Sequence, residues 1–177
     1  MNEINEFVSV DSRGKKKRSH LRPWVMLVIP LMAILFQVYV PLYLSLLRYL
    51  ELPLLVTIYL AVMRRSQVAG VFIGAGIGLV QDSLSHQPIG IFGMVKTLVG
   101  YAAASLGVRL DTEHVAVRFG LGFFFCVCHQ FLYWAARRTL LGEAAEFEYL
   151  QTLLAAFSNG TLAVPLFYLL DRLKESE

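Results

Sequence analysis

Residues 70–101 read GVFIGAGIGLVQDSLSHQPIGIFGMVKTLVGY: a glycine-rich apolar run, one acid, a polar turn and a second apolar run with one lysine. Gly70, Gly74 and Gly78 recur every fourth residue, so on a helix they form one face. Each glycine would cost a soluble helix about 1 kcal/mol against alanine, whereas small residues let membrane helices approach closely. The stretch therefore predicts two packed membrane helices joined by a turn over Ser83–Pro88.

Two charges accompany this hairpin. A lysine near mid-membrane costs roughly 2.5–3.5 kcal/mol on insertion scales, so Lys96 is expected to face protein and to have a partner. Asp82 lies closer to the turn than Lys96 by about 7 Å of helix, at about 1.5 Å per residue. A long lysine can cover that distance. Two alternatives stay open: an Asp82–Lys96 ion pair, or an Asp82 that caps the turn in water while Lys96 extends towards the turn alone.

The composition predicts an integral membrane protein. Of the 177 residues, 56% are apolar and 16% are charged, against about 25% charged in an average soluble domain. A chain of this length is expected to form one domain with short loops, which leaves no room for a soluble enzyme domain. Cys126 and Cys128 are two residues apart in one apolar run, so a helix points them to different sides and no disulfide follows.

Six apolar runs predict six transmembrane helices in an all-α membrane protein. The runs are Trp24–Val40, Leu52–Met63, Val68–Val80, Ile89–Leu110, Val115–Trp134 and Leu150–Leu170. The second run is shorter than the roughly 17–25 residues that span a bilayer, and residues 41–51 before it are expected to form an interfacial segment or a short re-entrant turn. The chain accordingly divides into a disordered basic tail (1–22), a six-helix transmembrane domain (23–171) and a C-terminal end (172–177).

The basic residues predict the orientation. With six helices and both termini inside, twelve of the 16 basic residues lie on the cytoplasmic side, three lie outside, and Lys96 lies in the membrane. Cytoplasmic loops carry an excess of lysine and arginine. The sequence therefore predicts that both termini are cytoplasmic.

No pattern of catalytic or metal-binding residues is present, so no enzyme, cofactor or nucleic-acid contact is predicted. Cys126 and His129 share a helix face, but two ligands are too few for a metal site, and a hydrogen-bonded core histidine is the better interpretation. In the last run Ala155, Asn159 and Ala163 share one face. This face and the Gly70–Gly74–Gly78 face are the candidate partner surfaces, with one of the two expected to be used inside the bundle.

The order of several residues resembles one family. Gly78, Asp82, the pair Ile89 and Gly90, and Tyr101 resemble the central signature of the rod shape-determining protein MreD family. The end of the chain is similar to that family's last helix, through Asn159, Gly160, Pro165, Arg172 and Lys174. The resemblance covers roughly residues 22–174. One departure is that Pro165 stands one residue further from Asn159 and Gly160 than expected.

The resemblance implies a non-catalytic scaffold of the bacterial cell-elongation machinery in the cytoplasmic membrane. It implies binding to MreC and, through MreC, to MreB and the peptidoglycan polymerase and transpeptidase pair, with membrane lipids around the helices. The residues expected to carry structure or interaction are Gly70, Gly74, Gly78, Asp82, Gly90, Lys96, Tyr101, Asn159 and Pro165.

The resemblance also implies a six-helix fold like that of the substrate-binding subunits of energy-coupling-factor transporters. Such a subunit, which binds a small molecule, is the alternative function. Those subunits contact their membrane partner through an Ala-x-x-x-Ala patch on the first helix, whereas Trp24–Val40 contains only Ala33. A membrane enzyme acting on lipid is a third class, and it would need catalytic groups clustered at one interface.

Overall fold

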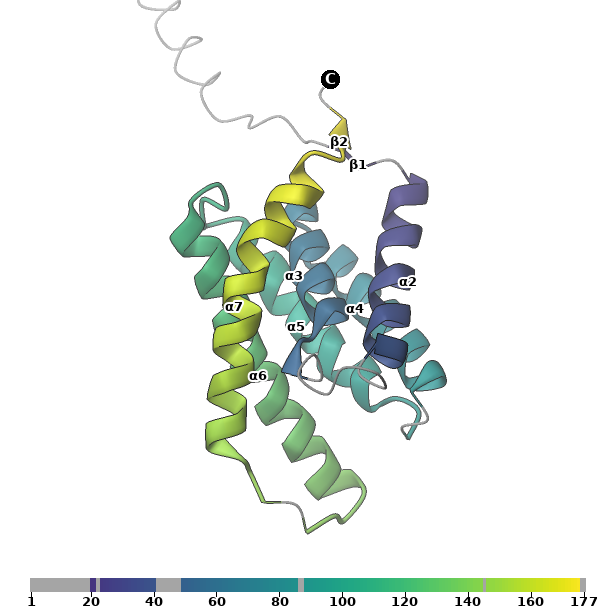
Figure 1. Cartoon of the computed structure of the whole chain (residues 1–177). Helices are drawn as coiled ribbons and strands as arrows, with labels where there is room; N and C mark the ends of the chain where they lie inside the picture. The colour runs from purple at the N-terminus through teal and green to yellow at the C-terminus, as the bar shows by residue number, and fades with distance from the viewer. Residues whose placement is uncertain (1–19, 22, 41–48, 86–87, 145, 176–177) are drawn as a thin grey trace, which may run out of the picture.

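A computed structural model describes residues 20–21, 23–40, 49–85, 88–144 and 146–175. Within these ranges the chain forms six helices and one two-residue strand pair (Figure 1). The elements are β1 (His20–Leu21), α2 (Pro23–Tyr39), α3 (Leu52–Arg64), α4 (Gln67–Leu84), α5 (Ile91–Gly107), α6 (Val115–Leu140), α7 (Tyr149–Asp171) and β2 (Lys174–Glu175). The prediction of an all-helical architecture is confirmed.

Local sequence signals explain where several helices begin and end. α3 ends at Arg65, which has a left-handed conformation (φ 50°) and donates its backbone N–H to the carbonyl of Ala61. Ser66 then caps α4 by accepting a hydrogen bond from the backbone N–H of Ala69, as expected of a serine at this position. Gly90 precedes α5 at φ 104°, a conformation that favours glycine.

The helices pack as two close pairs around a buried central helix. α4 packs most extensively on α5, and α6 packs on α7. The central helix is α3, which contacts all the other helices and is buried on every side from Pro53 to Val62. α2 lies at the edge of the bundle in Figure 1 and packs on α3 and α4. A helix that is apolar all round belongs in such a core, which explains why the short second run still forms a helix.

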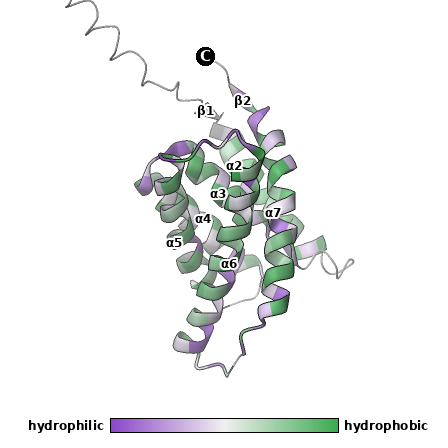
Figure 2. Cartoon of the chain, turned by 90° about the vertical axis from the view of Figure 1, so that its left-hand side faces the viewer, coloured by the Kyte–Doolittle hydropathy of each residue, from purple (hydrophilic) through white to green (hydrophobic). Residues whose placement is uncertain are grey.

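The helix lengths indicate a membrane protein. α4, α6 and α7, with 18, 26 and 23 residues, are long and apolar enough to cross a bilayer, whereas α2, α3 and α5 are shorter apolar helices. Figure 2 shows hydrophobic residues along most of the bundle and hydrophilic residues gathered at its two ends. α4 continues beyond the predicted Val80, so Asp82 lies in its last turn, and α6 continues beyond the predicted Trp134.

Both ends of the described chain lie at the same end of the bundle. β1 pairs antiparallel with β2, with His20 opposite Glu175 and Leu21 opposite Lys174. The connection between α6 and α7 lies at the opposite end (Figure 1). The predicted basic tail and interfacial segment, and the centre of the predicted Ser83–Pro88 turn, fall largely outside the described residues.

Candidate functional site

The glycine face of α4 is buried against the backbone of α5. A Cβ atom placed on any of its three glycines would lie between 2.0 and 2.4 Å from a carbonyl oxygen of α5. The contacts are Gly70 with Gly100, Gly74 with Lys96, and Gly78 with Phe92. Any larger residue at these positions would push the two helices apart, so glycine is required here by close approach.

Asp82 joins the end of α4 to the start of α5. Its buried carboxylate accepts hydrogen bonds from the backbone N–H groups of Gly90 at 2.9 Å, Phe92 at 3.1 Å and Gly93 at 3.0 Å. The first amides of a helix have no partner within the helix, and a carboxylate at this end is also favoured by the helix dipole. Asp82 therefore caps α5 from a neighbouring helix and holds the hairpin closed.

Of the two alternatives left open for Asp82 and Lys96, the ion pair is wrong. The Nζ atom of Lys96 lies 3.4 Å from Nε2 of His129 and 4.6 Å above the ring centre of Phe92. Across the described residues, no hydrogen bond or ion pair joins it to Asp82. The aspartate oxygens bind amides of α5 instead, and the lysine side chain reaches α6. The alternative is right that Asp82 is a cap, but wrong to place the cap in water, because Asp82 is only 1% exposed.

Asn159 connects the start of α3 to α6 and α7. Its Oδ1 accepts the backbone N–H of Glu51 at 2.8 Å. Its Nδ2 lies 2.8 Å from the carbonyl oxygens of both Tyr49 and Ala155 and 3.6 Å from Sγ of Cys126. The side chain is fully buried, so one amide fixes three segments that are distant in the sequence.

Glu51, Lys96, His129 and Asn159 form what we call the buried polar cluster. The carboxyl group of Glu51 lies within electrostatic range of the Lys96 ammonium group. Oε2 of Glu51 and Nδ1 of His129 are buried without a hydrogen-bond partner among the described residues. A buried polar atom without a partner reduces the stability of the fold by about 1–3 kcal/mol. The packing of the surrounding helices must therefore offset this loss.

Sequence reasoning found only part of this cluster. It identified Lys96 and Asn159, and its interpretation of His129 as a hydrogen-bonded core histidine agrees with the buried position of His129 beside Lys96. It assigned Glu51, however, to an interfacial segment. These residues come from the start of α3 and from α5, α6 and α7, and no local spacing relates them. Cys126 and His129 bind different neighbours, and the described residues contain no group of three or more potential metal ligands.

A second polar network lies at the end of the bundle near β1 and β2. Asp171 accepts a hydrogen bond from the hydroxyl of Tyr59 at 3.0 Å and forms ion pairs with Arg118 and with Lys174, the latter at 2.5 Å. Nε of Arg118 also donates to the carbonyl of Thr112 at 2.9 Å. The network ties α3, α6 and α7 together at this end.

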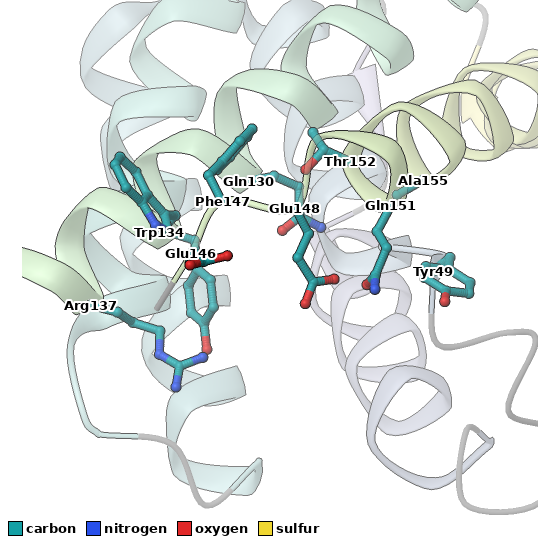
Figure 3. Close-up of a pocket in the computed structure, with 11 residues that line it drawn as sticks. Tyr49, Gln130, Trp134, Arg137, Glu146, Phe147, Glu148, Gln151, Thr152 and Ala155 are labelled. Carbon is teal, nitrogen blue, oxygen red and sulfur yellow. The ribbon is translucent and has the colours of Figure 1, made fainter. Parts of the chain in front are cut away.

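A pocket of about 260 Å³ lies at the other end, between α6 and α7 (Figure 3). Figure 3 shows Trp134 and Arg137 on one side, and Tyr49 and Gln151 on the other. Its walls are polar and aromatic, and they consist of Tyr49, Gln130, Tyr133, Trp134, Arg137, Glu146, Phe147, Glu148, Gln151, Thr152 and Ala155. Tyr49 and Ala155 also contact Asn159, so the pocket lies next to the buried polar cluster.

Two residues of the predicted set lie away from these groups. Tyr101 is 48% exposed on α5, and Pro165 is exposed within α7, which continues past it. The other predicted residues meet along the contact of α4 with α5 or in the buried polar cluster. Tyr101 and Pro165 instead face outward, where membrane or a partner would meet the bundle.

Both candidate small-residue faces are used inside the bundle, whereas only one of the two was expected to be. The Gly70–Gly74–Gly78 face packs on α5, as described above. Ala155, Asn159 and Ala163 are likewise buried, and a Cβ atom on Gly122 of α6 would lie 2.7 Å from Cβ of Ala163. Both faces therefore hold the bundle together.

The chain matches a model of a known protein family. A family model described as "rod shape-determining protein MreD" matches residues 17–173, nearly the whole chain. Searches of curated proteins and of solved structures give no match.

Proposed function

Because the chain belongs to the rod shape-determining protein MreD family, we propose that it is a non-catalytic membrane scaffold of the bacterial cell-elongation machinery. The family match over residues 17–173 carries this proposal and supports a role in determining rod shape. The closely packed helices agree with it, since their polar groups are used mainly to fix helices to one another.

The partner proposed for the scaffold is MreC, and through MreC the protein would connect MreB to peptidoglycan synthesis. The proposed location is the cytoplasmic membrane, with six spans and both termini in the cytoplasm. Two observations support this orientation: the pairing of β1 with β2 brings both described ends together, and the basic residues are concentrated on that side in the six-helix arrangement. A C-terminal reporter that is active only outside the cytoplasm should therefore stay silent.

The test of the scaffold is complementation. Rod-shaped cells depleted of their own MreD protein would express this chain, and cell width and the proteins that copurify with it would be measured. We expect rods to be restored and MreC to be retained. A stable protein that restores rods while retaining no MreC would contradict the proposed partner, and a stable protein that leaves the cells round would contradict the proposed function.

A second candidate is a small-molecule-binding subunit of an energy-coupling-factor type transporter, with the related fold. The polar and aromatic pocket between α6 and α7 (Figure 3) is the observation that favours it, because ligand sites combine aromatic side chains with polar groups that orient the ligand. Titration of the purified protein with water-soluble vitamins, followed by tryptophan fluorescence, separates the two candidates. The scaffold predicts no saturable change, whereas saturable binding would favour the transporter subunit.

A further inference from the structure

An apolar groove of about 590 Å³ runs along the outside of the bundle between α2 and α4. The described residues that line it are all apolar: Met26, Leu27, Pro30, Leu31, Ile34, Leu60, Phe72, Ile73, Gly76, Ile77 and Val80. Leu27 and Phe72 are each more than two-thirds exposed. A Cβ atom on Gly76 would have no neighbour within 4 Å, so this glycine, unlike those facing α5, leaves open space.

The length of the groove matches one leaflet of a bilayer. Its lining extends from Met26 to Ile34 on α2 and from Phe72 to Val80 on α4, which is about 12 Å of helix in each case. The hydrocarbon core of a bilayer is about 30 Å thick, so one leaflet contributes about 15 Å. A transmembrane helix would need a contact surface through both leaflets, whereas an acyl chain needs only one.

One end of the groove carries a cation without an acidic partner in the described part of the chain. Nη2 of Arg64 lies 2.8 Å from Sδ of Met26, a residue that lines the groove. A thioether sulfur is a weak acceptor, so the guanidinium keeps most of its capacity to bind an anion. Arg65 follows directly and is also exposed. Arginine binds phosphate oxygens well because its N–H donors form a planar fork.

We propose that this groove is a binding site for an anionic phospholipid. One acyl chain occupies the apolar channel between α2 and α4, and the headgroup phosphate contacts Arg64 at its end. The lipid belongs to the leaflet on the side where α3 ends and α4 begins. Bound in this way, it would fill the gap that α2 leaves at the edge of the bundle.

The test is native mass spectrometry of the whole protein in mild detergent with added phosphatidylglycerol or phosphatidylcholine of the same acyl chains. Arg64→Gln is expected to weaken phosphatidylglycerol binding about fivefold, which corresponds to about 1 kcal/mol per basic residue near a membrane surface. The effect on phosphatidylcholine should be smaller, because its choline group neutralises the charge of its phosphate. Gly76→Leu should fill the groove and weaken both lipids. Gly120→Leu is the matched control, because Gly120 of α6 also has open space around its Cβ position.

A labelling experiment on the unmodified protein makes the proposal independent of how the variants fold. Phosphatidylglycerol with a diazirine in one acyl chain is expected to label residues of the groove, such as Phe72 and Ile77. Labelling spread evenly over α6 and α7 would overturn the proposal, as would unchanged lipid binding by Arg64→Gln and Gly76→Leu. A photoreactive residue at Leu31 that captures one protein of constant mass in native membranes would assign the groove to a partner helix instead.

Discussion

Replacement of Asp82 by alanine is expected to open the hairpin between α4 and α5. The carboxylate accepts hydrogen bonds from three backbone amides at 2.9 to 3.1 Å, and Asp82 is buried. Loss of an ordinary N-cap costs about 0.5–2 kcal/mol, and a hydrogen bond to a charged group contributes about 1.5–3 kcal/mol. Because one residue serves three donors, we expect a loss of about 3–5 kcal/mol, a large part of the usual stability of about 5–15 kcal/mol.

The measurement is thermal unfolding in mild detergent, followed by the loss of the monodisperse peak in size-exclusion chromatography. Ser83→Ala is the matched control, because Ser83 is the next residue and its exposed hydroxyl donates to the carbonyl of Leu79. Asp82→Asn should have an intermediate effect, since one oxygen is retained while the amide group opposes a backbone N–H. Equal stability of Asp82→Ala and Ser83→Ala would refute the capping role.

The same variant distinguishes the cap from the rejected ion pair. If Asp82 neutralised Lys96, removing both charges would recover much of the stability lost in Asp82→Ala. The structure gives the two side chains different partners, so adding Lys96→Met to Asp82→Ala should recover little. Near-complete recovery in the double variant would mean that the charge pair, and not the cap, is the main interaction of Asp82.

Three further substitutions test the packing and the polar networks. Gly74→Ala should reduce stability by about 1–3 kcal/mol or more, because its Cβ would lie 2.0 Å from a carbonyl oxygen. Gly76→Ala is the control, since its Cβ meets no neighbour, and equal yields of the two folded variants would contradict the predicted contact. Asn159→Ala leaves a buried amide and carbonyl unpaired and should cost about 2–4 kcal/mol, and an unchanged unfolding temperature would show that these bonds are dispensable. Arg118→Gln breaks a largely buried ion pair and should reduce the free energy of unfolding by about 1–3 kcal/mol. The same change at the more exposed Arg137 should reduce it by less than about 1 kcal/mol, and a larger effect at Arg137 in thermal unfolding would contradict this ranking.

The sequence predicted the helices well because their signals are local. Apolar runs, the glycine spacing and the turn residues all act within a few residues. Most helix ends lie close to the predicted positions, although α4 continues to Leu84 and α6 to Leu140. The spacing of Gly70, Gly74 and Gly78 also indicated close backbone packing, and their contacts with α5 have that geometry. What the spacing could not show was whether the facing helix belongs to this chain or to a partner.

The polar interactions were predicted less well because their partners come from distant helices. Opposite charges and nearby positions on a hairpin made an Asp82–Lys96 ion pair one of the two alternatives. Backbone N–H groups, however, compete with a cation for the oxygens of an aspartate. Every residue except proline has a backbone N–H, so the identities of Phe92 and Gly93 do not indicate that their N–H groups bind Asp82. Likewise, nothing near Glu51 in the sequence indicates that its backbone N–H binds Asn159, 108 residues further along the chain.

Because both small-residue faces are buried, a variant on either face that fails to support rod-shaped cells cannot be interpreted directly as defective in partner binding. Variants of Gly74, Asp82 or Asn159 should affect cell shape through loss of the folded bundle, so round cells carrying them would say little about partner binding. Tyr101 and Pro165, which also belong to the family-like pattern, lie on the outer surface instead. The hydroxyl of Tyr101 has no hydrogen bond in the described part of the chain. Substitutions at these two positions can therefore separate contacts outside the bundle from those that hold it together.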